Sequence, residues 1–294
     1  MSATFAIAFG GGGARGLAHI HIIEALDELG IRPVSIAGSS IGAIMGAAMA
    51  AGMSGREIHQ YAHSILGRRA EVASRIWQAR PENLTEMIGN GLRLGQLNIE
   101  RILKAFLPIQ IPDDFAELKI PLQVTATDFF GHELVVLQQG GLHSALAASA
   151  AIPAVFGPVT HDGRLLIDGG IYNPVPFDLI EGHADITIAI DVVGVPTVNG
   201  RGRPGSLDLV LGASQLMMQS IIAGKLSQKR PDIFLQAPVS RFRALDFLKI
   251  DAVMAETAPL KDELKRAIDT ALRLQDPELP GFSGRKPGRA SGSP

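Results

Sequence analysis

Short apolar runs alternate with longer amphipathic segments along most of this chain. A short apolar run between polar or glycine-rich stretches predicts a buried strand, and apolar residues three and four apart predict a helix. The predicted strands cover residues 4–9, 34–37, 122–127, 134–137, 165–167, 186–192 and 233–235, and the predicted helices cover residues 17–29, 208–228 and 258–274. Because strands alternate with helices, we expect an α/β fold with a mostly parallel central sheet and helices on both faces. The first helix should end at Gly30, since glycine suits a C-cap.

The 294 residues suit one large domain, which we expect over residues 1–280, with a disordered tail over residues 281–294. Residues 54–113 form an irregular helical insert whose apolar side chains, Trp77 and Phe106 among them, are too many for a solvated surface. The insert either packs as ordinary helices or caps an acyl-chain pocket. Its arginines favour a solvated basic face, with transient contact to a membrane surface as the alternative. We expect the Leu- and Met-rich helix at 208–228 to belong to the core.

Charge and composition exclude several classes of protein. A net charge of −2 gives no reason to expect nucleic-acid binding, and the absence of cysteine removes disulfides, a thiol nucleophile and thiolate metal sites. The N-terminus has no basic segment before its apolar run, so we expect no signal peptide. The uncharged run at residues 33–55 is long enough to span a membrane, but it divides into a strand, a turn and a helix. We therefore predict a cytoplasmic protein, peripheral at a membrane at most.

The first candidate site is the pentapeptide from Gly38 to Gly42, which has the pattern G-x-S-x-G between a predicted strand and a small-residue helix. In a nucleophile elbow this pattern exposes the central serine at a sharp turn, and its glycines avoid clashes with neighbouring backbone. Ser40 is therefore the candidate nucleophile. The alternative is a serine that merely begins a helix.

A glycine-rich loop, Gly10 to Gly16, joins the first strand to the first helix. Its backbone N–H groups suit an oxyanion hole, but Gly11, Gly13 and Gly16 also spell the dinucleotide-binding pattern G-x-G-x-x-G. That pattern needs a carboxylate at the end of the second strand, where this chain has serines. The oxyanion interpretation is favoured, and dinucleotide binding stays as an alternative.

The third candidate is Asp168, which follows a predicted strand and precedes Gly169 and Gly170. On its own, this aspartate is better explained by an Asx turn.

Together and in this order, the three motifs resemble those of the patatin-like phospholipase family, in particular its short bacterial single-domain members. Residues 124–129 and 148–156 also resemble the family. The resemblance implies a three-layer sandwich and a Ser40–Asp168 catalytic dyad. It further implies an oxyanion hole formed by backbone N–H groups. The N–H donors would be those of Gly11, Gly12, Gly13 and Ile41. The residues that support the three motifs are Arg15, Gly16, Gly38, Gly42, Gly169 and Gly170. Because the chain has no cysteine, no H-E-x-x-H motif and no acidic calcium loop, we predict no metal requirement, and we expect no cofactor.

None of the eight histidines lies in a motif that would make it the base of a triad. In a dyad Asp168 takes the serine proton, which requires partial desolvation to raise its pKa from about 4. For Arg15 we favour bracing of the loop over substrate binding. We predict a serine acyl hydrolase acting on carboxylic esters of lipids. The alternatives are an acyltransferase on the same scaffold, a dinucleotide-binding protein and a regulatory protein without activity. The sequence does not determine the oligomeric state.

Overall fold

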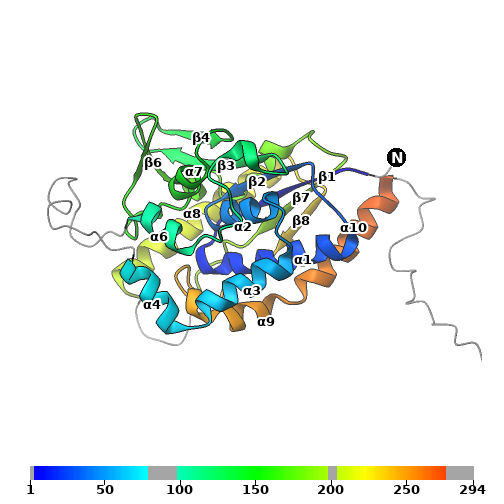
Figure 1. The fold of residues 1–294 in the computed structure, drawn as a ribbon. Coiled ribbons are helices and arrows are strands. Elements are labelled where there is room, and N and C mark those ends of the chain that lie inside the picture. The colour runs from blue at the N-terminus through cyan, green and yellow to red at the C-terminus, as the bar shows by residue number, and fades with distance from the viewer. Residues whose placement is uncertain (1–2, 79–97, 198–203, 276–294) are drawn as a thin grey trace, which may run out of the picture.

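The computed structural model describes residues 3–78, 98–197 and 204–275 (Figure 1). These residues build an eight-stranded sheet in the order β5-β6-β3-β2-β1-β7-β8, with β4 also paired to β3. Strands β1, β2, β3, β7 and β8 pair in parallel, whereas β4 and β6 run antiparallel to β3, and β5 antiparallel to β6. The strands are β1 (Phe5–Phe9), β2 (Ser35–Ser39), β3 (Leu122–Asp128), β4 (Glu133–Leu137), β5 (Val159–His161), β6 (Arg164–Asp168), β7 (Ile186–Asp191) and β8 (Ile233–Gln236).

Helices cover both faces of this sheet. The α-helices are α1 (His19–Leu29), α2 (Ile41–Ala50), α3 (Gly55–Leu66), α4 (Arg69–Gln78), α6 (Ile99–Phe106), α7 (Leu142–Ser149), α8 (Ser206–Gln228), α9 (Ile250–Thr257) and α10 (Leu260–Gln275). Short 3₁₀ turns lie at Gly13–Ala18, Phe115–Glu117, Gly169–Ile171, Phe177–Ile180 and Phe247–Lys249.

Alternation along β1 separates two cores. Phe5, Ile7 and Phe9 belong to the large core that also contains apolar residues of α1, α2, α3, α7, α9 and α10. Ala6 and Ala8 point to the other face, where they join a smaller core. That core also contains Phe177 of the 3₁₀ turn Phe177–Ile180 and Ile222 of α8. The packing gives three layers, with α1, α3, α9 and α10 gathered on one side of the sheet (Figure 1). The predicted α/β sandwich with a mostly parallel sheet is confirmed.

Most predicted elements lie where the pattern placed them, with small shifts at their ends. The first helix begins as the 3₁₀ turn Gly13–Ala18, and it ends at Gly30, whose φ of 69° is the left-handed C-cap conformation. Strand β5 was not predicted, because its three residues are too short to show a pattern.

The prediction that α8 belongs to the core is wrong. Within α8, Ile222 is the single buried residue, and Leu209, Leu216 and Met217 are each 58% exposed. Among the described helices, α8 alone is long and apolar enough to cross a membrane, and 6% of its most apolar stretch is buried. Length and composition of one helix are weak evidence for a span, but they show how apolar this exposed helix is.

The described part of the predicted insert contributes some residues to the large core and leaves the others partly or fully exposed. Ile58 of α3 and Ile99 and Leu103 of α6 join the large core, and the hydroxyl of Tyr61 donates to the carbonyl of Phe106. The side chain of Trp77, residues 79–97 and the C-terminal tail from residue 276 lie outside the described residues. The capping role of residues 54–113 stays a prediction.

Candidate active site

Ser40 lies on the turn between β2 and α2, in a backbone conformation rare for any residue but glycine. Its φ is 54° and its ψ is −125°, a strained conformation that the surrounding packing must hold. The flanking glycines permit this packing. A Cβ on Gly38 would lie 2.5 Å from Cα of Ala43, and one on Gly42 would lie 2.2 Å from the carbonyl oxygen of Phe9. The turn thus has the geometry of a nucleophile elbow.

Asp168 comes to this turn from β6, which is separated from β2 by the single strand β3. It ends β6, which pairs antiparallel with β3 in a register that sets Asp168 opposite Ala126. The Ser40 hydroxyl donates a 2.6 Å hydrogen bond to Oδ2 of Asp168, and the Gly170 N–H donates a 2.8 Å hydrogen bond to Oδ1. A Cβ on Gly169 would lie 2.2 Å from the carbonyl oxygen of Thr125, so the D-G-G sequence allows the close approach.

Burial changes the acidity of this aspartate. The Ser40 and Asp168 residues are 4% and 3% exposed. Desolvation raises the pKa of Asp168 to about 6, although the hydrogen bonds from Ser40 and Gly170 favour the ionised form. A carboxylate with this pKa is a better proton acceptor near neutrality than an exposed one.

The glycine-rich loop lies beside the Ser40–Asp168 pair. The Gly11 N–H donates to the carbonyl oxygen of Pro174 at 2.9 Å, which argues against Gly11 as an oxyanion donor. Gly12 and Gly13 line the same pocket as Ser40, and their N–H groups have no acceptor among the residues that the structure describes. The N–H of Ile41 is likewise without an acceptor there, at the start of α2. The N–H groups of Gly12, Gly13 and Ile41 are thus the candidate donors to an oxyanion.

The side chain of Arg15 is buried beside the glycine-rich loop, at the edge of the pocket that holds Ser40. Its Nε donates to the carbonyl oxygen of Gly12 at 3.0 Å, and its Nη1 donates to that of Val193. Desolvation lowers the pKa of Arg15 to about 10, opposed by the charges of Asp191 and Asp246. These contacts fit the bracing role that we expected for Arg15. Gly16 lies where a Cβ would meet the Ile41 side chain at 2.3 Å, which joins the loop to the elbow.

Two neighbours of the pair were given no role in the sequence analysis. The Ser149 hydroxyl, at the end of α7, accepts a 2.8 Å hydrogen bond from the Ser40 N–H and holds the elbow. Ser149 lies within residues 148–156, which resemble the family, and this resemblance could have indicated a role for it in the site. From α8, Leu211, Ser214, Gln215 and Met218 wall the pocket. No sequence signal placed α8 there.

The pocket around Ser40 is small, about 50 Å³ in volume. Ligand pockets commonly measure about 300–1,000 Å³, so the space enclosed beside Ser40 is smaller than a dinucleotide or a long acyl chain occupies. The dinucleotide alternative also lacks its carboxylate, because β2 ends in Ser39.

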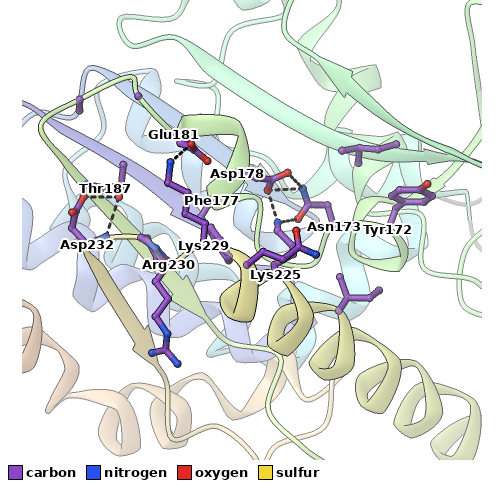
Figure 2. Close-up of a pocket in the computed structure, with 16 residues that line it drawn as sticks. Tyr172, Asn173, Phe177, Asp178, Glu181, Thr187, Lys225, Lys229, Arg230 and Asp232 are labelled. Carbon is purple, nitrogen blue, oxygen red and sulfur yellow. Dashed lines mark hydrogen bonds and ion pairs between the residues drawn. The ribbon is translucent and has the colours of Figure 1, made fainter.

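A larger hollow of about 510 Å³ lies beside the C-terminal half of α8 (Figure 2). The charges around it mostly pair with one another. Lys225 contacts Asp178 and donates to the Val175 carbonyl oxygen, and Lys229 contacts Glu181. Figure 2 shows Lys225, Asn173 and Asp178 directed toward one another. This network ties α8 to the segment after Gly170. The Thr187 hydroxyl, which also lines the hollow, donates to Asp232 at 2.7 Å in an exposed contact that joins β7 to the residue before β8.

The structure describes all eight histidines, and none of them forms a hydrogen bond or ion pair with Ser40 or Asp168. Nε2 of His19 contacts the carbonyl oxygen of Gly10 at 2.8 Å, and Nε2 of His21 contacts that of Met254 at 2.9 Å. Burial lowers the pKa of His19 to about 4. His59 and His63 face Glu24 and Asp251. Within residues 3–78, 98–197 and 204–275, no group of three or more histidine or carboxylate side chains is arranged to hold a metal.

Known proteins resemble this chain in sequence and structure. Residues 7–180 match the profile of the family described as patatin-like phospholipase. An uncharacterised NTE family protein of Mycobacterium tuberculosis is 41% identical over 194 residues, which cover 66% of this chain and 50% of that protein. Human patatin-like phospholipase domain-containing protein 6 is 30% identical over 198 residues, covering 64% of this chain and 13% of that protein.

The chain thus spans about half the length of the mycobacterial relatives that it matches. Among solved structures, VipD from Legionella pneumophila has a TM-score of 0.46 and 16% identity, covering 90% of this chain and 67% of that one. The family profile covers more than half of the chain and includes all three motifs. The chain therefore belongs to the patatin-like phospholipase family.

Proposed function

We propose that this protein is a serine acyl hydrolase that cleaves carboxylic ester bonds of lipids through a Ser40–Asp168 dyad. One observation carries the proposal: the Ser40 hydroxyl donates to the buried Asp168 carboxylate at 2.6 Å. A nucleophile in contact with a base is the arrangement that covalent acyl transfer requires. Membership of the patatin-like phospholipase family supports a lipid ester as the substrate.

In the first half of the reaction, Ser40 Oγ attacks the carbonyl carbon while its proton passes to Oδ2 of Asp168. The carbonyl oxygen becomes an oxyanion, which accepts hydrogen bonds from the N–H groups of Gly12, Gly13 and Ile41. When the intermediate collapses, the bond to the leaving alkoxide breaks, and Asp168 returns the proton to it. The products of this half are a free alcohol and an ester of Ser40.

In the second half, water attacks the Ser40 ester and Asp168 accepts the proton of that water. Collapse of the second intermediate releases the fatty acid and restores the Ser40 hydroxyl. No step uses a metal or a cofactor. Arg15 contributes indirectly, because its bond to the Gly12 carbonyl holds the loop before substrate binds.

Labelling with a fluorophosphonate, followed by peptide mapping, tests the nucleophile. The wild-type protein should be modified at Ser40 alone, and Ser40→Ala should not be modified. Ser39→Ala is the matched control, since Ser39 is adjacent and fully buried and its hydroxyl has no hydrogen-bond partner among the described residues. Labelling that persists in Ser40→Ala would refute the proposal.

Activity on lipid then tests the substrate class. Phospholipids and p-nitrophenyl esters should release fatty acid in the wild-type protein and not in Ser40→Ala. A product formed with an added alcohol in place of water would identify a transferase. We expect the enzyme to contact a lipid surface transiently during catalysis, and cytoplasmic residence stays a prediction.

A further inference from the structure

The outward face of α8 is free of charge over four turns, and Ser220 is its one exposed polar residue from Leu209 to Ala223. Its exposed residues recur every three to four positions, as expected for one side of a helix. Leu209, Leu216 and Met217 are each 58% exposed and Val210 is 49% exposed. Between Asp208 and Lys225, α8 contains no charged residue. An exposed helix side is ordinarily polar, so this surface needs an explanation.

The inward side of α8 carries the polar contacts instead. The Gln215 side chain donates to the Val193 carbonyl oxygen at 3.1 Å, and that of Gln219 donates to Oδ2 of Asp191 at 3.1 Å. Lys225 donates to the Val175 carbonyl oxygen at 2.8 Å. These hydrogen bonds fix the rotation of the helix about its own axis. Leu209, Leu216 and Met217 consequently face outward in the folded protein.

The same helix is a wall of the catalytic pocket. Leu211, Ser214, Gln215 and Met218 line the space around Ser40 and Asp168, on the side opposite the exposed leucines. Anything that covers the outward face of α8 therefore lies one helix diameter, about 10 Å, from the catalytic pocket. The acyl chain of a lipid that moves into the pocket from a membrane on this face need not cross bulk water.

The size and charge of this surface favour a membrane over a second protein. From Leu209 to Ala223 the face is about 21 Å long and about 10 Å wide, or about 200 Å². A stable protein interface buries about 800 Å² on each partner. Basic side chains lie at both ends of the face: Arg243 pairs with Asp208 at one end, and at the other Lys229, which pairs with Glu181, is followed by exposed Arg230. Both ion pairs are solvent-exposed and therefore weak, so these cations can exchange their partners for lipid phosphates. Apolar side chains between basic residues match the acyl and phosphate layers of a lipid surface.

We propose that the outward face of α8, defined by Leu209, Val210, Leu216 and Met217, docks the protein on a phospholipid membrane beside the catalytic pocket. This inference rests on the proposed function, because a lipid substrate gives the docking its purpose. Its test therefore measures binding separately from catalysis.

Position on the membrane can be read directly, because the chain contains no cysteine. An environment-sensitive fluorophore is attached to Met217→Cys and, as a control, to Ile109→Cys, a position 95% exposed in the loop after α6. Both variants carry Ser40→Ala so that lipid is not consumed. With vesicles of phosphatidylcholine and phosphatidylglycerol, the probe at residue 217 should shift to the blue and be protected from an aqueous quencher. The probe at residue 109 should change little. Equal responses at the two positions would overturn the proposal.

Substitution of the face tests its contribution to affinity. The variant Leu216→Gln/Met217→Gln should partition into the vesicles at least about tenfold more weakly, since it removes two large apolar side chains from the interface. Its kcat/KM on a soluble short-chain ester should stay within about twofold of wild type, because neither residue lines the pocket. Ile109→Gln/Leu274→Gln is the matched control, with both positions more exposed than the α8 residues, and should bind as wild type does.

The outcomes separate the two proposals. Wild-type vesicle binding by Leu216→Gln/Met217→Gln would refute docking through α8, whatever the activity. A wild-type dimer in solution that this variant dissociates would also refute it, by assigning the face to a second copy. Absence of ester hydrolysis by a wild-type protein that binds vesicles through α8 would refute the proposed function and leave the docking surface standing.

Discussion

Ser40 Oγ and Asp168 Oδ2 lie 2.6 Å apart, although 128 residues separate them in sequence. Two sheet pairings bring them together. Strand β2, which precedes Ser40, pairs in parallel with β3, and β3 pairs antiparallel with β6, which ends in Asp168. The carboxyl ends of β2 and β6 meet beside β3, so the sheet, rather than any local motif, produces the contact.

Replacement of the aspartate tests the base. Asp168→Asn keeps the shape of the side chain but cannot accept the serine proton. We expect kcat/KM to fall by about 10²–10⁴-fold, the usual cost of losing a general base, and by more if Asp168 also orients Ser40. Ester hydrolysis and circular dichroism measure activity and folding. Each histidine replaced singly by glutamine is the comparison series, and one folded, equally inactive member would replace the dyad with a triad.

The pH dependence of catalysis should report the buried carboxylate. Burial raises the pKa of Asp168 to about 6, and only the ionised form accepts a proton. We therefore expect kcat/KM to rise with pH, about tenfold per unit below the pKa, and to level off above about 6. Rates on a soluble ester between acid and neutral pH measure this. An inflection of the kcat/KM profile near the ordinary aspartate pKa would show that the site does not desolvate Asp168. An inflection whose pH changes when one histidine is replaced would be assigned to that histidine.

The same shift predicts that Asp168 destabilises the fold at neutral pH. Its folded pKa of about 6 exceeds the unfolded value of 3.8, so between these values the folded protein binds more protons than the unfolded one. Stability contributed by this group is complete below pH 3.8, falls as the pH rises, and is lost above about 6. This difference between the folded and unfolded pKa of Asp168 corresponds to roughly 3 kcal/mol.

Asp168→Asn should therefore unfold at a higher temperature than wild type at pH 8, with an advantage of up to about 3 kcal/mol that shrinks toward pH 4. Thermal unfolding of both proteins across this range measures the difference. Ser40→Ala, which keeps the carboxylate, should not show the same pH-dependent gain. A less stable Asp168→Asn at pH 8 would mean that hydrogen bonds to the carboxylate outweigh its desolvation.

The sequence predicted those parts of the candidate site that depend on local geometry. Gly38 and Gly42 flank a turn whose backbone excludes larger residues, and that constraint is visible within five positions of the chain. The pairing of Ser40 with Asp168 came from the family resemblance, because no periodicity reports which strands become neighbours. Gly11 looked equivalent to Gly12 and Gly13 because its bond to Pro174 joins segments far apart in sequence.

The exposure of α8 could not be predicted from its own residues. Apolar side chains occur around its whole circumference, so the pattern does not say which side faces the sheet. On the sheet surface that α8 faces, the small side chains of Ala6, Ala8, Ala37 and Ala189 leave room for other residues. Val175 and Phe177 pack against that surface, where most of α8 does not reach. The polar residues Gln215 and Gln219 then find carbonyl and carboxylate partners inside. These partners lie outside α8 in sequence, so they can be identified only once the tertiary structure is known.

A pair of glycine substitutions tests how tightly the elbow is packed against the glycine-rich loop. A Cβ on Gly42 would lie 2.2 Å from the Phe9 carbonyl oxygen and 2.6 Å from that of Gly10. Both oxygens belong to backbone, which cannot swing away as a flexible side chain would. Gly42→Ala must therefore separate α2 from the end of β1, and we expect it to destabilise the protein by about 3 kcal/mol or to prevent folding. Gly224→Ala, in α8, places its Cβ in open space and should be neutral or stabilise the helix by up to about 1 kcal/mol. Denaturant unfolding of the two variants measures the difference, and wild-type stability in Gly42→Ala would show that the elbow tolerates a side chain there, contrary to the geometry that holds Ser40 in place.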